Sequence, residues 1–286
     1  MDKRLGIVAG SGTLPFIVAR NARNEGIGHI YAVGFKGQTD PALEQHVDGI
    51  SWIGLGQIGK LIDFFKSNLV DKAVFIGRIG HDIVFSNLKL DMRMLQLAMK
   101  LKDWRTDSIL GAIADEITAS GITITDSTTY LTNLLPSAGV LTGRKPDSKQ
   151  EDDIKFGFYI AKRLSGLDIG QTVVVKKKTV LALEAIEGTD KAILRGAELG
   201  KKDVVVVKVS KPNQDMRFDV PVIGMNTLDI LHTARAAVLA IEAGKTILID
   251  KDAFVRQADA LKIAVVAVDP ASVNMESYAP YCSDKK

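Results

Sequence analysis

The chain has 286 residues, 46% of them hydrophobic, which supplies enough apolar material for one large domain or two smaller ones. Its 37 basic and 34 acidic side chains leave a net charge of +3, too balanced for a typical nucleic-acid-binding protein. The single cysteine, Cys282, excludes an internal disulfide and a thiolate metal cluster, and no apolar run is long enough to span a membrane, so we expect a cytoplasmic protein that is soluble or at most peripherally attached.

The first half of the chain alternates predicted strands with predicted helices. We expect apolar strands over residues 5–9, 29–33, 72–76 and 122–125. We expect helices over residues 14–25, 57–68, 91–101 and 107–119. Strands separated by helices are typical of a parallel, doubly wound sheet, and this predicts an α/β domain of Rossmann-like type.

A glycine turn, Gly10-Ser11-Gly12, joins the first strand to the first helix. Such a turn leaves backbone N–H groups at a helix N-terminus, and we expect Gly10, Ser11 and Gly12 to contact a phosphate or another anionic part of a substrate. The alternative is a plain tight turn. The third glycine of the dinucleotide fingerprint is missing, and the next strand ends without an acid for a ribose hydroxyl. An NAD-dependent dehydrogenase is therefore disfavoured.

Polar residues follow two of the predicted strands. Arg78 and His81 come after the strand at 72–76, and Asp126 comes after the strand at 122–125. Ligands of open α/β sheets bind along the carboxyl edge, so these residues are candidates for substrate contact. A helix N-cap is the alternative interpretation of Asp126.

The predicted helix over residues 91–101 holds three of the seven methionines, Met92, Met94 and Met99. Flexible apolar side chains of this kind suit a path for acyl chains, with nearby basic residues facing lipid head groups. The basic residues in question are Lys89, Arg93, Lys100, Lys102 and Arg105. The alternative, which we favour from the pattern, is an amphipathic helix packed on the sheet.

Between residues 135 and 148 the pattern breaks into turn formers and charges. We place the domain boundary there, with an N-terminal domain over 1–140 and a distinct C-terminal α/β domain over 141–286. In the second domain we expect strands over 172–176, 179–184, 204–209, 246–249 and 264–268. We expect helices over 150–165, after Asp190, over 226–244 and, briefly, before the last strand.

Charged residues are concentrated between Leu181 and Gly224. Acids stand around the Gly188 turn, and Arg195 follows one helical turn later. A second charged segment lies near Pro212 and Pro221. The charged residues of the two segments are Glu184, Glu187, Asp190, Lys208, Lys211, Asp215, Arg217 and Asp219. Carboxylates beside cations suit phosphoryl chemistry, in which oxygen ligands hold a metal while Lys and Arg meet the phosphate charge. The alternative is a solvated strand-turn-strand.

Other hydrolytic sites are missing from the sequence. The chain has no H-E-x-x-H zinc motif, no G-x-S-x-G elbow and no Walker P-loop. Any hydrolysis is therefore expected to use carboxylates, with Mg²⁺ that keeps several of its waters.

Four motifs give the chain a family resemblance. They are A-G-S-G-T-L-P near the start, L-D-I-G-Q-T-V-V-V at 167–175, L-A-x-E-A-x-E-G-T-D at 181–190 and K-P-x-Q-D-x-R-x-D-x-P-x-I-G at 211–224. The chain resembles the LpxI-type UDP-2,3-diacylglucosamine pyrophosphatases over residues 4–268. The resemblance implies cleavage to UMP and 2,3-diacylglucosamine 1-phosphate, known as lipid X, in lipid A biosynthesis. It also implies Mg²⁺ or Mn²⁺ as cofactor, attack of water on the sugar-side phosphorus, and a lipid held between two domains.

The resemblance also suggests roles for the charged residues. Asp219 would be the essential carboxylate, with Asp215, Arg217 and Lys211 as further catalytic residues. Arg195 and Thr189 would bind substrate, and Arg195 would help Lys211 and Arg217 to neutralise the diphosphate. The expected metal ligands are Asp219, Glu184, Glu187 and Asp190. The expected location is the cytoplasm, with transient contact at the cytoplasmic face of the inner membrane. The alternative function is a non-catalytic carrier of a UDP-sugar or lipid in the same cleft.

Overall fold

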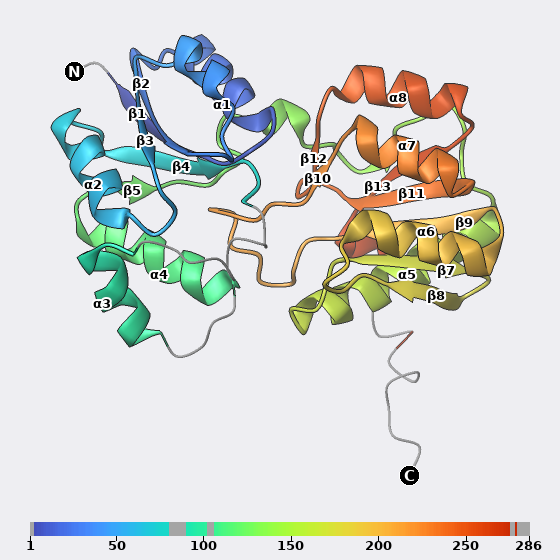
Figure 1. Cartoon of the computed structure of the whole chain (residues 1–286). Helices are drawn as coiled ribbons and strands as arrows, with labels where there is room; N and C mark the ends of the chain where they lie inside the picture. Colours follow the sequence, from blue (N-terminus) through green and yellow to red (C-terminus); the bar gives the residue numbers. More distant parts are fainter. Residues whose placement is uncertain (1–2, 80–89, 102–105, 275–277, 279–286) are drawn as a thin grey trace. The chain divides into compact units, whose positions relative to one another are not determined.

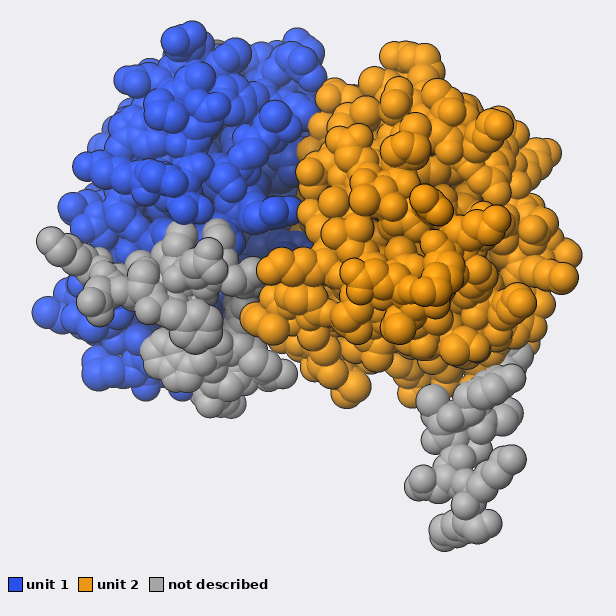
Figure 2. Space-filling view, turned by 45° about the vertical axis from the view of Figure 1, so that its right-hand side comes forward, with its two compact units in different colours: residues 1–132, 215–219 blue, residues 133–214, 220–286 orange. Residues whose placement is uncertain are grey.

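The computed structural model describes residues 3–79, 90–101, 106–274 and 278, which form two compact units (Figure 1). Unit 1 consists of Met1–Thr132 and Asp215–Asp219, and unit 2 consists of Asn133–Gln214 and Val220–Lys286 (Figure 2). The first junction thus falls at residues 132–133, earlier than the boundary at 140 expected from the sequence. The units differ from the predicted domains in a second way: five residues from the second half of the chain, Asp215–Asp219, belong to unit 1.

Unit 1 is built on a parallel sheet of five strands in the order β3-β2-β1-β4-β5. The strands are β1 (Arg4–Ala9), β2 (His29–Phe35), β3 (Gly49–Ile53), β4 (Lys72–Ile76) and β5 (Thr123–Ile124). The helices are α1 (Leu14–Asn24), α2 (Ile58–Ser67), α3 (Met92–Lys100) and α4 (Thr106–Ala119), with 3₁₀ turns at Pro41–His46 and Thr132–Leu134. The predicted parallel α/β domain is confirmed, although β3 was not anticipated. This strand order reverses between β1 and β4, where open α/β sheets bind their ligands.

The main hydrophobic core of unit 1 lies between the sheet and the helices α2, α3 and α4. Ile62 and Phe65 of α2 and Ile117 of α4 are fully buried there against strand residues such as Val33. Phe218, 5% exposed, packs into the same cluster. The segment Asp215–Asp219 is therefore part of this core and not a passing loop.

Unit 2 contains a mixed sheet of six strands in the order β6-β13-β11-β9-β7-β8. The strands are β6 (Gly139–Val140), β7 (Thr172–Lys176), β8 (Thr179–Leu183), β9 (Val204–Lys208), β11 (Ala236–Glu242) and β13 (Ala264–Val268). Strands β9, β11 and β13 are parallel, whereas β7 runs antiparallel to both β9 and β8, and β6 runs antiparallel to β13. Two short strands, β10 (Val222–Ile223) and β12 (Ile247–Leu248), form a separate parallel pair.

Helices cover both faces of the unit 2 sheet. Helix α5 (Ser148–Gly166) packs on one face, against Val173, Val205 and Val207. The other face is covered by α6 (Thr189–Gly200), α7 (Met225–Thr233) and α8 (Lys251–Ala260), and a 3₁₀ turn follows the last strand at Pro270–Ser272 (Figure 1). The inner strands β7, β9, β11 and β13 are buried on both sides, which explains their continuous apolar sequences. The predicted second α/β domain is confirmed.

Residues 226–244 do not form the single helix predicted from the sequence, and that prediction is wrong. Helix α7 ends at Thr233, and Arg235 has a positive φ of 50° at the position where helices commonly terminate. The following seven residues, Ala236–Glu242, form the fully buried strand β11. A short apolar run of this kind does not distinguish a buried strand from a buried helix by its periodicity.

None of the helices in the described part of the chain is both long enough and apolar enough to cross a membrane.

Candidate functional site

Polar side chains of unit 2 collect at one edge of its sheet. Strands β8, β9 and β11 end at this edge with Leu183, Lys208 and Glu242. Strand β7 runs the other way, so its first residue, Thr172, lies here too and pairs with Lys208. Most of the charged residues singled out from the second half of the sequence follow these strand ends, as expected for a ligand site in an α/β sheet.

A hydrogen-bonded chain connects three of these residues. Lys208 Nζ donates to Thr189 Oγ1 over 2.7 Å, and Thr189 Oγ1 donates to Glu184 Oε1 over 2.8 Å. The directions are fixed, because an ammonium group can only donate and a hydroxyl carries one proton. Glu184 and Lys208 are 9% and 8% exposed. The expected metal ligand Glu184 and the expected substrate contact Thr189 are therefore hydrogen-bonded directly to each other, and Lys208 donates to the threonine.

Glu187 and Arg195 form a second group beside α6. Arg195 Nη2 donates to Glu187 Oε1 over 2.5 Å and to the carbonyl oxygen of Leu183 over 2.8 Å. The hydrogen bond from Arg195 lowers the pKa of Glu187. Both residues are exposed enough to line a shallow surface pocket with Lys191, Leu194 and Glu198. Glu187 is thus an ionised carboxylate already paired with the cation that we expected to bind substrate.

Asp190 and Lys211 have partners of their own. Asn226 Nδ2 donates to Asp190 Oδ2 over 3.1 Å. Lys211 Nζ lies 2.6 Å from Asp168 Oδ1, and the two side chains are 16% and 30% exposed. Asp168 was not among the residues singled out from the sequence, although it stands in the L-D-I-G motif.

The sequence analysis missed a buried ionic group at the ends of β9 and β11. Glu242, fully buried, accepts hydrogen bonds from Lys162 Nζ at 2.8 and 3.0 Å. Its Oε2 also accepts from Ser210 N and Ser210 Oγ, at 2.9 and 2.8 Å. Lys162 Nζ also donates to Ser210 O over 2.9 Å, so every polar atom of Ser210 is engaged. Burial lowers the pKa of Lys162, although the bond to Glu242 acts in the opposite direction.

The expected metal ligands do not form a metal site within unit 2. Glu184, Glu187 and Asp190 belong to this unit and Asp219 belongs to unit 1. The three acids of unit 2 contact three different neighbours, as described above. Across the described ranges, no three His, Cys, Asp or Glu side chains are grouped so as to hold a metal ion. The unit 2 acids alone therefore do not form a preformed metal cage, and a bound Mg²⁺ would need further oxygen ligands from substrate phosphates or water.

At the carboxyl edge of the unit 1 sheet, the glycine turn after β1 is joined to the loop after β4. Ser11 N donates to Arg78 O and Arg78 N donates to Ser11 O, at 2.8 and 3.0 Å, and Ser11 Oγ also donates to Arg78 O. A Cβ on Gly10 would lie 2.7 Å from Arg78 O, so only glycine permits this approach. The structure thus brings together three of the residues expected to contact substrate, Gly10, Ser11 and Arg78, while Gly12 has a positive φ of 93° and open space around it.

Asp126 makes the local contacts of an Asx turn. Its Oδ1 accepts from Thr128 N and Thr128 Oγ1, at 2.7 and 2.6 Å. The next helical element begins only at Thr132, so Asp126 is not the N-cap of a helix, and a contact with substrate stays a prediction. His81, the other candidate at this edge, lies outside the described residues.

The segment Asp215–Asp219 carries three of the four expected catalytic residues into unit 1. Asp215 and Arg217 form a two-point ion pair, with Nη2–Oδ2 at 2.7 Å and Nε–Oδ1 at 3.0 Å. The Arg217 side chain also lies 3.7 Å from Asp115 Oδ1 and covers the ring of Phe218. The hydrogen bond from Arg217 lowers the pKa of Asp215 despite its partial burial. Asp219 is exposed and has a positive φ of 55°.

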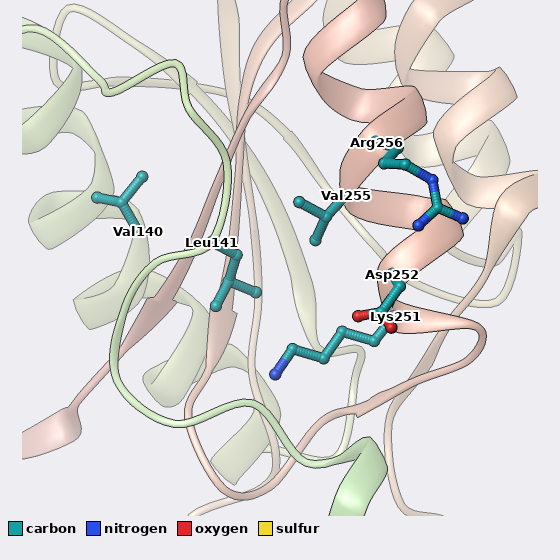
Figure 3. Close-up of a pocket in the computed structure, with 6 residues that line it drawn as sticks. All are labelled: Val140, Leu141, Lys251, Asp252, Val255 and Arg256. Carbon is teal, nitrogen blue, oxygen red and sulfur yellow. The ribbon is translucent and has the colours of Figure 1, made fainter.

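A further surface pocket lies in unit 2. It has a volume of about 440 Å³ and is lined by Val140, Leu141, Lys251, Asp252, Val255 and Arg256. Figure 3 shows Arg256 pointing away from Val140 and Leu141, while Lys251 extends below them. The charged groups do not converge on one point, and none of the residues expected from the sequence lines this pocket.

Comparisons with known proteins cover almost the whole chain. A family model described as the LpxI N-terminal domain matches residues 4–134, and one described as the LpxI C-terminal domain matches residues 137–266. The UDP-2,3-diacylglucosamine pyrophosphatase LpxI of Caulobacter vibrioides is 31% identical over 280 residues, which cover 94% of this chain and 98% of that protein.

Solved structures give only weak similarities. The biotin carboxylase domain of a thermophilic 2-oxoglutarate carboxylase matches with a TM-score of 0.28 and 13% identity, over 61% of this chain and 34% of its own. Pyruvate carboxylase of Rhizobium etli matches with a TM-score of 0.26 and 13% identity, over 71% of this chain and 18% of its own. TM-scores this low do not establish a shared fold.

Proposed function

This chain belongs to the LpxI family, and we propose that it is a hydrolase that cleaves the diphosphate of UDP-2,3-diacylglucosamine. The observation that carries the proposal is the match of both LpxI domains in order along the chain, together with a relative named for this activity that aligns over nearly its whole length. The relative's name supports a hydrolase over the alternative of a non-catalytic carrier.

The products we propose are UMP and 2,3-diacylglucosamine 1-phosphate (lipid X), in the pathway to lipid A. A water oxygen forms a bond to the sugar-side phosphorus, and the bond from that phosphorus to the bridging oxygen breaks. The bridging oxygen leaves with UMP, and one proton of the water must be removed. We assign that proton to a carboxylate, with Asp219 as first choice and Asp215 as second.

Three cations remain our candidates for binding the diphosphate: Lys211, Arg217 and Arg195. Each is paired with a carboxylate in the free protein, as described above. Arg195 and Glu187 are partly exposed, and such pairs contribute only about 0–1 kcal/mol. Phosphate oxygens can therefore replace the Glu187 carboxylate at little cost. In the Lys211–Asp168 pair the lysine side chain is only 16% exposed, so we expect this pair to stay intact and to hold Lys211 in a fixed position.

The divalent metal is a proposal for the complex with substrate. Mg²⁺ is commonly bound by one or two carboxylates together with substrate phosphates and water, so it does not require a preformed protein cage. The candidate carboxylates are Glu184, Glu187 and Asp190 in unit 2 and Asp219 in unit 1. When bound, the metal would neutralise charge on the phosphate oxygens.

We also propose peripheral contact of the cytoplasmic protein with the inner membrane, because the substrate carries two acyl chains. Helix α3 packs on unit 1 through Met94 and Leu97, as the amphipathic pattern indicated. Its outer face exposes Met92, Leu95 and Met99, which are 69%, 43% and 80% exposed. Lys89, Lys102 and Arg105, the other expected lipid contacts, lie outside the described residues. Co-sedimentation with anionic vesicles, compared between the wild type and Met92→Ser/Met99→Ser, tests this contact.

The test of the main proposal is product analysis in ¹⁸O-water. The protein is incubated with UDP-2,3-diacylglucosamine and MgCl₂ or MnCl₂, and the products are examined by mass spectrometry. We expect UMP and the sugar 1-phosphate in equal amounts, with the label on the sugar 1-phosphate. Absence of UMP with either metal would refute the hydrolase. Label on UMP would instead refute attack on the sugar-side phosphorus. Asp219→Ala should abolish turnover and retain substrate binding.

A further inference from the structure

Ser127 occupies an unusual position between the unit 1 sheet and the segment Asp215–Asp219. It lies just beyond β5, where regular pairing with β4 stops. Backbone bonds run from Thr123 N to Asp71 O and from Thr125 N to Ala73 O, at 2.8 and 2.9 Å. The next acceptor along β4 is Phe75 O, and Ser127 Oγ lies 2.7 Å from it. The Ser127 hydroxyl therefore takes the place that a third backbone donor would have.

The backbone N–H and the same hydroxyl of Ser127 also contact two consecutive carbonyls of the segment Asp215–Asp219, which we call the inserted segment. Ser127 N donates to Met216 O over 2.8 Å, and Ser127 Oγ lies 2.6 Å from Arg217 O. The side chain is 2% exposed. Its single hydroxyl proton is donated to Phe75 O or to Arg217 O, so both carbonyls depend on one donor that water cannot readily replace.

The inserted segment has internal hydrogen bonds, so that contacts that hold Met216 and Arg217 in place also restrict the position of Asp219. Phe218 N donates to Asp215 O, and Arg217 N donates to Asp215 Oδ1, at 3.2 and 3.0 Å. The Phe218 ring is buried in the unit 1 core. Asp219 follows at once with its φ of 55°, a left-handed conformation that Asp adopts more readily than most residues.

We propose that Ser127 is a positioning residue, which fixes the turn at Asp215–Phe218 and thereby the Asp219 carboxylate on unit 1. Ser127 touches no reacting atom in this proposal, and its effect on the reaction is transmitted through the backbone of Met216 and Arg217. The inference rests on the proposed function for the role of Asp219. We call the contacts of Ser127 with Met216 O and Arg217 O the clamp; its existence does not depend on the proposed function.

The experiment compares Ser127→Ala with Thr129→Ala as matched control. Thr129 is in the same loop, and its hydroxyl also donates to a backbone carbonyl, that of Asp126, but not to the inserted segment. We expect Ser127→Ala to lower kcat for UMP release at least tenfold with KM changed less than threefold. Ser127→Cys, with a weak donor of similar size, should fall between this variant and the wild type. Thr129→Ala should keep kcat within twofold.

Amide hydrogen exchange of the full-length variants provides the second readout. Peptides that cover residues 215–219 should exchange at least tenfold faster in Ser127→Ala and at the wild-type rate in Thr129→Ala. Unchanged exchange in Ser127→Ala would overturn the clamp. Faster exchange with kcat still within twofold would overturn its role in the reaction. If the wild type released no UMP, the proposed function would fail, and the exchange rates would still decide whether the clamp exists.

Phe218→Leu loosens the same turn at its other anchor and covers the case in which Ser127→Ala does not fold. It should show the same pattern, with faster exchange over 215–219, lower kcat and KM little changed. If Phe218→Leu speeds exchange there and leaves kcat within twofold, the position of the turn does not govern the reaction and the proposal is wrong.

Discussion

Replacement of Lys162 by Met tests the buried ionic group of unit 2. Lys162 donates to both oxygens of Glu242, a carboxylate with no exposed surface. Removing one partner of a buried pair leaves an uncompensated charge, which typically costs about 3–5 kcal/mol. Glu242 would retain the two donors of Ser210 and a longer contact with Lys245 at 3.4 Å. We therefore expect a loss near the lower end, about 3 kcal/mol of the free energy of unfolding of unit 2.

The assay is urea denaturation followed by far-UV circular dichroism, fitted with one transition for each unit. With a denaturant slope of about 1–3 kcal/mol per molar urea, a loss of 3 kcal/mol lowers the midpoint of unit 2 by about 1–3 M. Lys178→Met is the matched control, because Lys178 and Asp152 also lie 2.8 Å apart but are about half exposed. We expect little or no change in the midpoint there, because solvent screens an exposed pair.

A double variant separates two contributions to stability: the destabilisation by an unpaired, buried Glu242 and the net stabilisation by the Lys162–Glu242 ion pair. In Lys162→Met/Glu242→Leu no charge is left unpaired, and stability should return to within about 1 kcal/mol of the wild type. Our reasoning fails if Lys162→Met costs no more than Lys178→Met, or if the double variant is as unstable as Lys162→Met.

Three further predictions follow from other contacts. Gly196→Ala should destabilise unit 2 by about 1–3 kcal/mol, because the new Cβ would lie 2.6 Å from Val174 Cβ, whereas Gly111→Ala on α4 has open space and should be neutral or stabilising in the same urea assay. The ionised form of Asp215 stabilises unit 1 above its unfolded pKa of about 3.9, and this contribution disappears as the pH falls through the lowered folded pKa. In Asp215→Asn the stability of unit 1 should therefore fall less steeply below pH 4 than in the wild type. If the pH dependence below 4 were the same in both, Asp215 would not be the group responsible. EDTA should abolish UMP release, with recovery on adding excess MgCl₂ or MnCl₂; full activity after exhaustive chelation would exclude the proposed metal.

The sequence was most informative where local pattern alone determines structure. The strands at Lys72–Ile76 and Ala264–Val268 are apolar runs between helices, and both were predicted at these bounds. The sequence predicts a helix at β11, because its six apolar and small residues before Glu242 fit either structure once both faces are buried. Only the pairing of Val238 and its neighbours with β9 and β13 decides between them.

The parts that could not be predicted depend on contacts between distant residues. Lys162, Ser210 and Glu242 are separated by tens of residues and share no motif. Phe218 reads as part of a charged segment in the second half of the chain, and its burial depends on a core formed by the first half. The polar residues Glu184, Thr189 and Lys208 can be singled out from the sequence, but the hydrogen bonds that join them follow from the pairing of β7, β8 and β9.

The inclusion of Asp215–Asp219 in unit 1 has a consequence for biosynthesis. A nascent chain that has left the ribosome only as far as Thr132 has all five strands of the first sheet, yet lacks the phenyl group that completes its interior. Phe218, which carries this phenyl group, is added to the chain more than eighty residues later, after much of unit 2 has been translated. The amino-terminal half thus reaches its final packing only late in synthesis, and a fragment ending at Thr132 would carry a permanent hole where Phe218 belongs.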